Sequence, residues 1–486
     1  MENEETNKEP QRTATQIPVC SATAANTAKK QKMLLVLAVF LCALCLRLAF
    51  IYELLQQNSS LYNDLNAAPQ ASFLTNDSGA YINLAKDFFS GYFGPESRSD
   101  ALLRTPGYPA FCALFYSLGL SPAGILIAQA VLAAIIPVLT LLLAHLFTGS
   151  LLLAACAGFL SAVSPTGIGL CGLIMSDMLF AVVLIAALYC LCRGALKAQG
   201  NQVLLSGLLF SAAFLVKPIL AFWPVCMIAV YYFFCRAATT KLNLHKLAIA
   251  VAIQIVILGL WCTRNYVYEN VFTPSSVTAG ALHDFMRPRV EEWVKVGALP
   301  SYDAVRSNRE AALKKFTQQS SGLSSKEKLQ ALNARAIEVF KAHPLTTAKV
   351  LLQNIKESTL SGWGYFPRQL PRRFQLQKNL TIAVWQTELV FRKYSLLAVM
   401  VFFLYLCLRT VFKNTDENRK NFFVAAALGS TYSYFALLAG TTCFYGPRII
   451  YPVEFIVILL LCMALQQAVR ACSHIFLPAK TSSATG

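Results

Sequence analysis

Residues 33–54, MLLVLAVFLCALCLRLAFIYEL, indicate the class of fold. This stretch is apolar and long enough to cross the roughly 30 Å hydrocarbon core of a bilayer as one helix. Lys29, Lys30 and Lys32 precede it. The stretch is too long for a signal peptide and lacks a small-residue cleavage site. The positive-inside rule therefore predicts a membrane span with a cytoplasmic N-terminus.

Similar apolar runs recur along the chain, of which 56% is apolar and 14% charged, against about 25% charged residues in soluble proteins. This composition excludes an ordinary cytosolic enzyme. We expect an all-α multi-spanning membrane protein with about ten helices, within a range of nine to thirteen. The expected spans are 33–54, 123–147, 151–168, 176–193, 203–217, 219–235, 246–263, 394–412, 421–439 and 451–470.

Alternating these spans across the membrane gives basic inner turns, as the positive-inside rule requires, apart from an almost uncharged turn near Thr148. Both termini are then cytoplasmic, and two long loops, about 55–122 and 264–392, lie outside. The expected organisation is a disordered cytoplasmic tail (1–32), an N-terminal transmembrane core (33–263) with a catalytic first external loop, an external juxtamembrane helical region (264–392), C-terminal transmembrane helices (393–472) and a cytoplasmic tail (473–486).

Two segments of the outer loops have helical signals of their own. Residues 106–120 are apolar but short and bounded by proline, which indicates an interfacial helix or a half-span. From Ser325 to Glu357 the apolar residues recur at helical spacing, which predicts amphipathic helices near the membrane surface.

The net charge of +18 lies between apolar segments rather than on one polar face. This distribution indicates membrane lipids and anionic lipid-linked substrates as partners, and no nucleic acid. The five histidines are scattered without an HExxH pattern, so we expect no metal site. No nucleotide-binding glycine motif is present either.

Several polar residues stand where the predicted topology reaches the outer face. Asp77 and Arg104 lie in the first outer loop, and further examples are Asp177, Lys217, Arg264 and Arg448. Each has a simpler explanation as a helix cap, a loop residue or a cation that snorkels to the interface. Asp177 is best explained in this way, as an N-cap. Several cations on one face nevertheless favour an anion site, because cations at this depth are costly.

The order of motifs resembles family 39 of the polyprenol-phosphate-sugar-dependent glycosyltransferases with the GT-C fold. That family includes protein O-mannosyltransferases, the aminoarabinose transferase that modifies lipid A, and RgtA/B/C/D-like proteins. The resemblance runs from about Leu41 to Pro452. The motifs that carry it are Asn76-Asp77-Ser78 with Tyr81, Arg104-Thr105-Pro106-Gly107-Tyr108-Pro109, Ser164-Pro165, Ser176-Asp177, Lys217-Pro218, Trp261 with Arg264-Asn265-Tyr266, His343-Pro344, and Tyr445 with Arg448 and Pro452.

The resemblance implies a transmembrane bundle of the GT-C type and a role for each matching residue. Asp77 corresponds to the catalytic base. The expected donor-phosphate ligands are Arg104, Lys217, Arg264 and Arg448, and the expected substrate contacts are Tyr81, Tyr108, Asn265 and Tyr445. The sequence departs from the mannosyltransferase pattern, which has two acids at 76–77 and His-Pro-Pro at 105–107. This departure favours the bacterial lipid or glycan branch, in a plasma membrane with the site facing outside.

The chemistry supports the same roles. Transfer from a lipid phosphate passes through an oxocarbenium-like state while negative charge grows on the departing phosphate. Arginine binds phosphate through a charged fork, and a carboxylate on the opposite face can take the acceptor proton, which inverts the anomeric centre. Cations can neutralise one phosphate, so no cofactor is required besides the polyprenyl-phosphate-sugar. The acceptor would be a lipid, glycan or protein.

Two other functions are compatible with these residues. A transporter or flippase for a lipid-linked anion would use the same outer cations without Asp77 as base, but should place polar residues on broken helices near the midplane. A glycan ligase or polymerase of another membrane fold would share the donor class without requiring Asp77.

Overall fold

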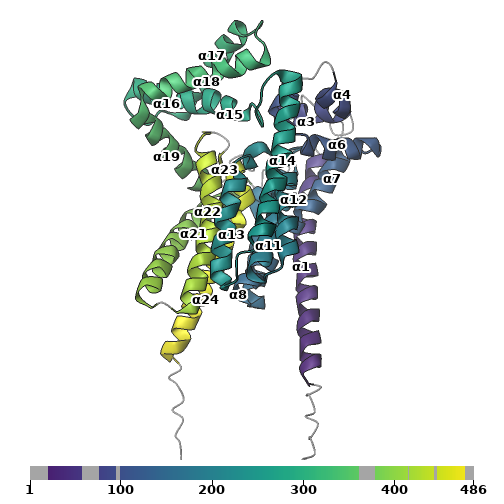
Figure 1. Cartoon of the computed structure of the whole chain (residues 1–486), viewed down its shortest axis with the longest axis vertical. Coiled ribbons are helices and arrows are strands. Elements are labelled where there is room, and N and C mark those ends of the chain that lie inside the picture. The colour runs from purple at the N-terminus through teal and green to yellow at the C-terminus, as the bar shows by residue number, and fades with distance from the viewer. Residues whose placement is uncertain are drawn as a thin grey trace, which may run out of the picture.

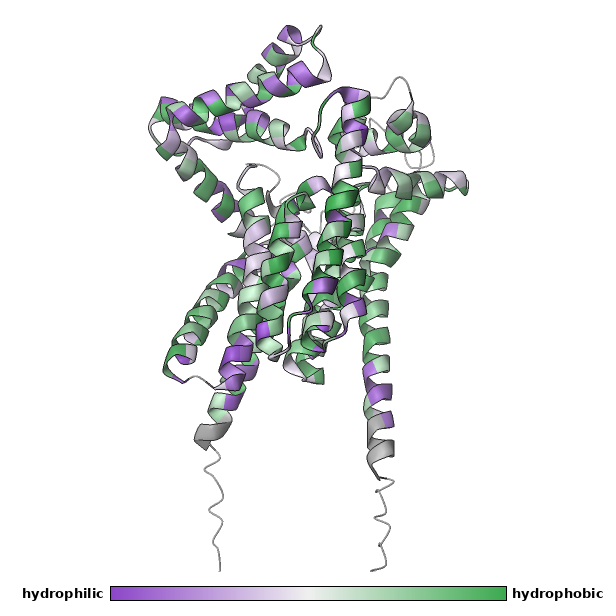
Figure 2. Cartoon of the chain, in the orientation of Figure 1, coloured by the Kyte–Doolittle hydropathy of each residue, from purple (hydrophilic) through white to green (hydrophobic). Residues whose placement is uncertain are grey.

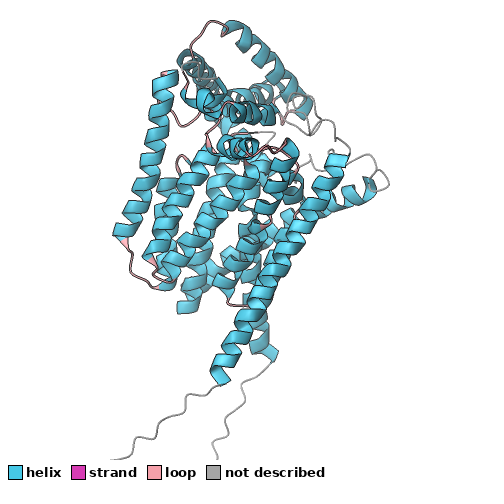
Figure 3. Ribbon diagram, turned by 90° about the vertical axis from the view of Figure 1, so that its right-hand side faces the viewer, coloured by secondary structure: helices cyan, strands magenta, loops and turns pink. Residues whose placement is uncertain are grey.

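The computed structural model describes residues 20–56, 76–94, 99–360, 378–413, 415–442 and 446–476. Throughout these residues the regular structure is helical (Figure 3). The helices form a long bundle with a separate group of helices at one end (Figure 1). The expectation of an all-α multi-spanning membrane protein is confirmed.

Seven helical stretches of the described chain are long and apolar enough to cross a membrane, or eight if one bent pair is counted as a span. They comprise α1 (Cys20–Gln56), α7 with α8 (Pro122–Ala133 and Ile135–Thr148), α11 (Asp177–Leu196), α14 (Leu244–Glu269), α21 (Lys378–Phe412), α22 (Asp416–Ala439), and α23 with α24 (Gly446–Ile450 and Glu454–Phe476). The bent pair is α9 (Leu151–Ala162) and α10 (Pro165–Cys171), which meet at 49°.

The remaining two expected spans are shorter helices, α12 (Gly200–Val216) and α13 (Trp223–Ala238). At 1.5 Å per residue each is only about 25 Å long. Between them Lys217 has an extended backbone and precedes Pro218, as proline requires of the residue before it. The ten expected spans thus correspond to eight helical segments long enough to cross a membrane, with the bent pair counted as one, and to two shorter apolar helices.

Helix α11 occupies the middle of the bundle, where it packs against α7, α8, α12 and α13. It is apolar on all sides, as expected for a helix surrounded by others. Helices α1 and α21 are peripheral, because only 22% and 17% of their apolar windows are buried inside the protein. Their remaining surface is therefore available to lipid acyl chains.

A buried ion-pair cluster attaches α21 to the core. Arg392 Nη2 lies 2.9 Å from Glu388 Oε1 on the same helix and 3.0 Å from Glu454 Oε1 on α24. It also donates to Thr166 Oγ1 on α10 at 3.3 Å. The cluster joins three helices at the break between α9 and α10, where Ser164 precedes the proline that starts α10.

The separate group at one end of the bundle includes five α-helices, which we call the far-end helices. They are α15 (Val277–Gly280), α16 (Arg287–Val296), α17 (Tyr302–Gln319), α18 (Ser325–Ala342) and α19 (Pro344–Leu360). Figure 2 shows many hydrophilic residues on them, in contrast to the hydrophobic bundle. A capping box between Ser324 and Glu327 begins α18. The sequence-based prediction of helices over 325–357 is confirmed.

Some boundaries differ from the expected ones. Helix α1 begins at Cys20, so residues 20–32 extend the first helix instead of belonging to a disordered tail. Helix α14 continues to Glu269 and α21 starts at Lys378, so both limits of the expected external region fall within helices. Hydropathy marks where a helix enters lipid, not where its hydrogen-bonded backbone ends.

The apolar segment 106–120 contains α6 (Gly107–Ser117). Its 11 residues give a length of about 16 Å, which is too short to cross a bilayer. It lies across the end of the bundle near α7 (Figure 1). The interfacial alternative is therefore the one the structure favours.

Candidate functional site

A chain of alternating charges joins five separate parts of the sequence at the end of the bundle that faces α15–α19. Arg104 forms an ion pair with Asp77, whose other oxygen lies 2.9 Å from Arg448 Nη1. Arg448 Nε is 2.8 Å from Asp177, which also binds Lys217 Nζ at 2.7 Å. We call these five residues the charged chain. It contains three cations and two carboxylates, so one positive charge is left for an anion.

The elements that carry these residues explain their convergence. Asp77 lies in the first turn of α3 (Asn76–Lys86), and Arg104 follows α5 (Ser99–Leu103). Lys217 lies at the break between α12 and Pro218, and Asp177 is the first residue of α11. Arg448 belongs to α23, beside α22 and α19.

Gly107 allows the Arg104 segment to reach Lys217. A Cβ atom at this position would lie 2.7 Å from the backbone carbonyl of Leu215, at the end of α12. Because backbone cannot move aside as a flexible side chain can, only glycine allows α6 to pack this closely on α12. Tyr92 Oη donates to Arg104 O at 3.1 Å, and Ser275 Oγ donates to Leu103 O at 2.9 Å, which fixes the same segment from the outer side.

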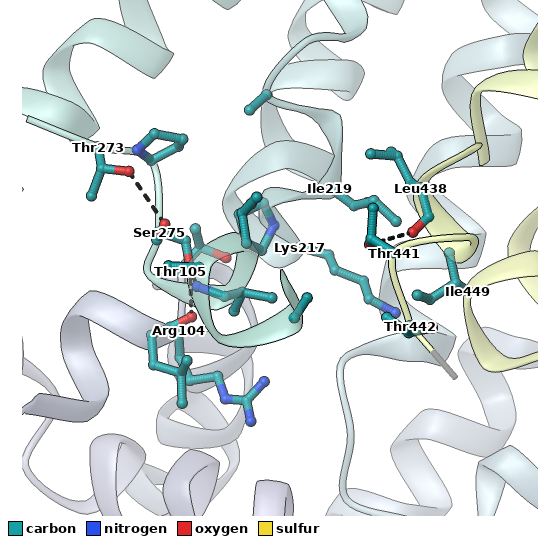
Figure 4. A pocket seen from close by; sticks show the side chains of 18 of the residues that line it. Arg104, Thr105, Lys217, Ile219, Thr273, Ser275, Leu438, Thr441, Thr442 and Ile449 are labelled. Carbon is teal, nitrogen blue, oxygen red and sulfur yellow. Dashed lines mark hydrogen bonds between the residues drawn. The ribbon is translucent and has the colours of Figure 1, made fainter. Parts of the chain in front are cut away.

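A cavity of about 360 Å³ adjoins the charged chain. Arg104, Lys217 and Arg448 lie on its wall, together with Tyr81 and Thr442. In Figure 4 Arg104 lies on one side, and the side chain of Lys217 extends toward Thr442. Leu329 and Asn333 of α18 also contribute, so the cavity extends from the bundle to the far-end helices.

The two carboxylates differ in accessibility. The side chain of Asp77 is 28% exposed and that of Asp177 only 1%. Burial acts to raise the pKa of Asp77, but Arg448 and Arg104 outweigh it and lower the pKa to about 2. Asp77 is therefore ionised and partly accessible beside the cavity-lining residues Arg104 and Arg448, whereas Asp177 is enclosed.

The expected N-cap role of Asp177 is wrong. Ser176 precedes it as the capping residue but makes no capping side-chain bond, and the carboxylate of Asp177 holds Lys217 and Arg448 instead. The sequence does show that Ser176 and Asp177 stand at the start of an apolar span. The role of Asp177 could not be inferred from it, because the ion-pair partners Lys217 and Arg448 are 40 and 271 positions away.

Arg264 and Asn265 lie apart from the charged chain. Arg264 Nε donates to Tyr92 O at 2.8 Å, and its Nη1 donates to Asn265 Oδ1 at 3.0 Å. Asn265 Nδ2 donates to Thr273 O at 2.7 Å. These two residues hold the backbone around the cavity and are not part of its lining.

The expected substrate contacts are divided between the cavity and the interior. Tyr81 lines the cavity below the Arg104 guanidinium, which lies 5.0 Å from the ring centre, and its hydroxyl is 3.0 Å from Ser176 Oγ. Tyr108 is completely buried, packs against Tyr81 and donates to Gln129. Tyr445 lies outside the described residues.

The far-end helices are tied to the edge of the cavity through Asn354. Its Nδ2 donates to Gly440 O at 2.9 Å, next to the cavity residues Thr441 and Thr442. Arg289 of α16 binds Asn354 and forms a two-bond ion pair with Glu357. Over the described residues, no group of three or more His, Cys, Asp or Glu side chains is placed to hold a metal ion.

Together, the fold and the site define an integral multi-pass membrane protein with a charged site at one end of its helix bundle. Residues 103–261 match the family described as dolichyl-phosphate-mannose-protein mannosyltransferase. This match over part of the chain confirms the resemblance to the family 39 glycosyltransferases. The matched region contains Arg104, Asp177 and Lys217 but neither Asp77 nor Arg448.

Comparison with curated proteins gives no match. The matches among solved structures include two oligosaccharyltransferases. The archaeal oligosaccharyltransferase AglB from Archaeoglobus fulgidus, with an inhibitory peptide and a dolichol-phosphate, is 13% identical with a TM-score of 0.39, over 93% of this chain and 52% of that one. An oligosaccharyltransferase from Archaeoglobus fulgidus tethered to an acceptor peptide is 14% identical with a TM-score of 0.35, over 91% and 50%. The chain spans about half the length of each.

Proposed function

We propose that this protein transfers a sugar from a polyprenyl-phosphate-linked donor to an acceptor at the membrane surface. The observation that carries the proposal is the charged chain, which places three cations on the wall of the cavity and pairs two of them with the accessible carboxylate of Asp77. The donor phosphate would bind Arg104, Arg448 and Lys217. The family match supports this donor class.

In this mechanism the donor phosphate competes with Asp77 for its two arginines. A carboxylate held by two guanidinium groups is a weak base, as its lowered pKa indicates. When the phosphate takes up Arg104 and Arg448, the pKa of Asp77 rises, and the carboxylate becomes able to accept a proton. Binding of the donor thus activates the base.

The reaction breaks the bond between the anomeric carbon and the phosphate oxygen. The acceptor hydroxyl attacks the anomeric carbon from the opposite face and gives its proton to Asp77. The lipid phosphate leaves with the electron pair of the broken bond, and the three cations stabilise its charge. This single displacement inverts the anomeric configuration. Asp177 acts as a positioning residue, because it holds Arg448 and Lys217 while its own side chain is enclosed.

Arg264 and Asn265 are assigned a positioning role in the same proposal, since their polar groups hold Tyr92, Thr273 and each other. The proposed site faces outside, in a bacterial plasma membrane, and the acceptor is an external lipid, glycan or protein. The departure from the mannosyltransferase motif favours a lipid or glycan.

The test begins with a mass comparison of lipid and glycan fractions from cells with and without the protein. The sugar found is then supplied to purified protein as its polyprenyl-phosphate ester, and the product anomer is determined by nuclear magnetic resonance. Transfer with inversion is expected. Donor that crosses a vesicle membrane unconsumed would instead identify a flippase, and retention of configuration would exclude the single displacement.

A further inference from the structure

A cluster of basic side chains lies at the end of the bundle opposite the charged chain. Lys32 precedes the apolar part of α1, and Arg193 and Lys197 lie in the last turn of α11 and directly after it. Lys32 is close enough to Lys197 and Arg193 for their charges to repel one another. His145, near the end of α8, is close to both lysines. We call these four residues the basic cluster.

The cluster lacks compensating carboxylates. Across the ranges described above, Lys32, Arg193 and Lys197 form no ion pair, whereas every cation of the charged chain does. Arg193 Nη1 reaches the hydroxyl of Tyr189 at 3.4 Å, and its Nε is buried without a hydrogen-bond partner. Like charges gathered without an acid are unfavourable unless an anion lies among them.

A cavity of about 1010 Å³ adjoins the basic cluster at Lys197. Lys420 also lies on its wall, and so does Asn421, whose Nδ2 is buried without an acceptor. The two acids on the wall are already paired, Asp416 with Arg419 and Glu417 with Arg470. The groups still available here are therefore donors and cations.

The depth of the cluster indicates the ligand. Lys32 stands directly before the apolar run that starts at Met33, and Lys197 directly after Leu196 at the end of α11. Both are thus at the level of lipid headgroups. Basic pockets between transmembrane helices at this level are suited to phosphate-bearing headgroups. The peripheral helix α1, with 22% of its apolar window buried, offers a surface for acyl chains.

We propose that the basic cluster and its cavity form a second phosphate site, which binds the headgroup of an anionic membrane lipid. Asp177 and Arg193 lie on one straight helix, 16 residues and hence about 24 Å apart. The second site is therefore distinct from the proposed donor site and does not depend on the proposed sugar transfer. Arg193 and Lys197 contact the phosphate, with Lys32 closing the site from α1.

The proposal is tested by thermal unfolding of the full-length protein in neutral detergent. The protein is titrated with dioctanoyl phosphatidylglycerol, with dioctanoyl phosphatidylcholine and with inorganic phosphate. A saturable rise of Tm is expected with phosphatidylglycerol alone. The variant Arg193→Gln/Lys197→Gln should need about 30-fold more phosphatidylglycerol for half of the rise, at roughly 1 kcal/mol for each lost cation.

Two comparisons make the result specific. The matched variant Lys241→Gln/Lys413→Gln loses two exposed charges outside the cluster and should titrate like the unmodified protein. Because the charged chain could also bind a lipid phosphate, the titration is repeated with Arg104→Ala, in which the saturable rise should persist. Equal titrations of the two double variants, or loss of the rise in Arg104→Ala, would overturn the proposal.

The same rise of Tm with inorganic phosphate would overturn the assignment of the ligand to a lipid. If the cluster variant does not fold, Lys197→Gln alone is expected to show about a fivefold effect.

Discussion

Arg448 Nη1 lies 2.9 Å from Asp77 Oδ2, although 371 positions separate the two residues. The same guanidinium holds Asp177 through its Nε. Arg448 therefore connects the accessible carboxylate with the enclosed one, and joins the last part of the bundle to its first outer segment. This link gives the two aspartates different tasks, which can be separated experimentally.

Asp77→Asn should lower turnover by roughly 10² to 10⁴, since the amide cannot accept the acceptor's proton. Donor affinity should be kept or increased, because Arg104 and Arg448 lose the competing carboxylate. Asp177→Asn should instead lower stability, by up to about 3 kcal/mol, since it leaves Lys217 without a carboxylate partner while Arg448 keeps Asp77. Transfer assays, donor titration and melting curves distinguish the two effects. Asp303→Asn, at an exposed position of α17, serves as the matched control. Near-normal transfer by Asp77→Asn would assign the base to another residue.

Arg104→Ala should weaken donor binding, and Arg104→Lys should restore it only in part, because lysine cannot make a two-bond contact with phosphate. The affinity for a polyprenyl-phosphate-sugar, measured on purified protein, tests this prediction. Arg306→Ala, which removes an exposed arginine of α17, provides the comparison. If the alanine variant at 104 binds donor as tightly as the unmodified protein, the role of Arg104 is limited to its pairing with Asp77.

Acidification should weaken the structure through Asp77. Its pKa is about 2 in the folded protein and about 3.9 in an unfolded chain. A carboxyl with a lowered folded pKa contributes stability that is complete above its unfolded pKa and is lost as the pH falls toward its folded pKa. The loss should therefore occur between about pH 4 and pH 2 and reach up to about 2 kcal/mol. Melting temperatures over this range should fall more steeply for the unmodified protein than for Asp77→Asn. Parallel curves would show that Asp77 is not held by the arginines in solution.

Arg392→Met should destabilise the protein by about 3 to 5 kcal/mol, because it leaves Glu388 and Glu454 buried without a cation. Glu388→Gln should cost less, since Arg392 keeps Glu454 as its partner at 3.0 Å. Melting curves in detergent measure both effects. Arg419→Met, at an exposed ion pair, should change the stability by less than about 1 kcal/mol. A similar small effect for Arg392→Met would mean that α21 is attached by apolar contacts alone.

Single cysteines at Asp303 and Lys241 should label from opposite sides of the membrane. Both positions are exposed, one on α17 and the other after α13. In a variant without native cysteines, an impermeant maleimide should reach position 303 in intact spheroplasts and position 241 only after permeabilisation. The opposite pattern would place the proposed site inside the cell and contradict the proposal that it faces outside.

The class of fold follows from the amino-acid sequence, because membrane insertion depends on the summed hydropathy of a local stretch. Runs such as 33–54 identified the spans, and the apolar spacing over 325–357 identified two of the far-end helices. The sequence also identifies Asp77, Arg104, Lys217 and Arg448 as candidate site residues, since charged residues near apolar spans are energetically costly and often functional.

Which of these residues contact one another depends on the tertiary structure. The contact between Asp77 and Arg448 depends on how α3 and α23 are packed, and Asp177 belongs to the charged chain because α11 begins beside Lys217. The same packing directs Arg264 toward the carbonyl of Tyr92 and buries Tyr108 against Gln129. Hydropathy and spacing are local properties of the chain. The pairing of charges depends instead on which face each helix turns inward, and contacts between helices far apart in the sequence set that orientation.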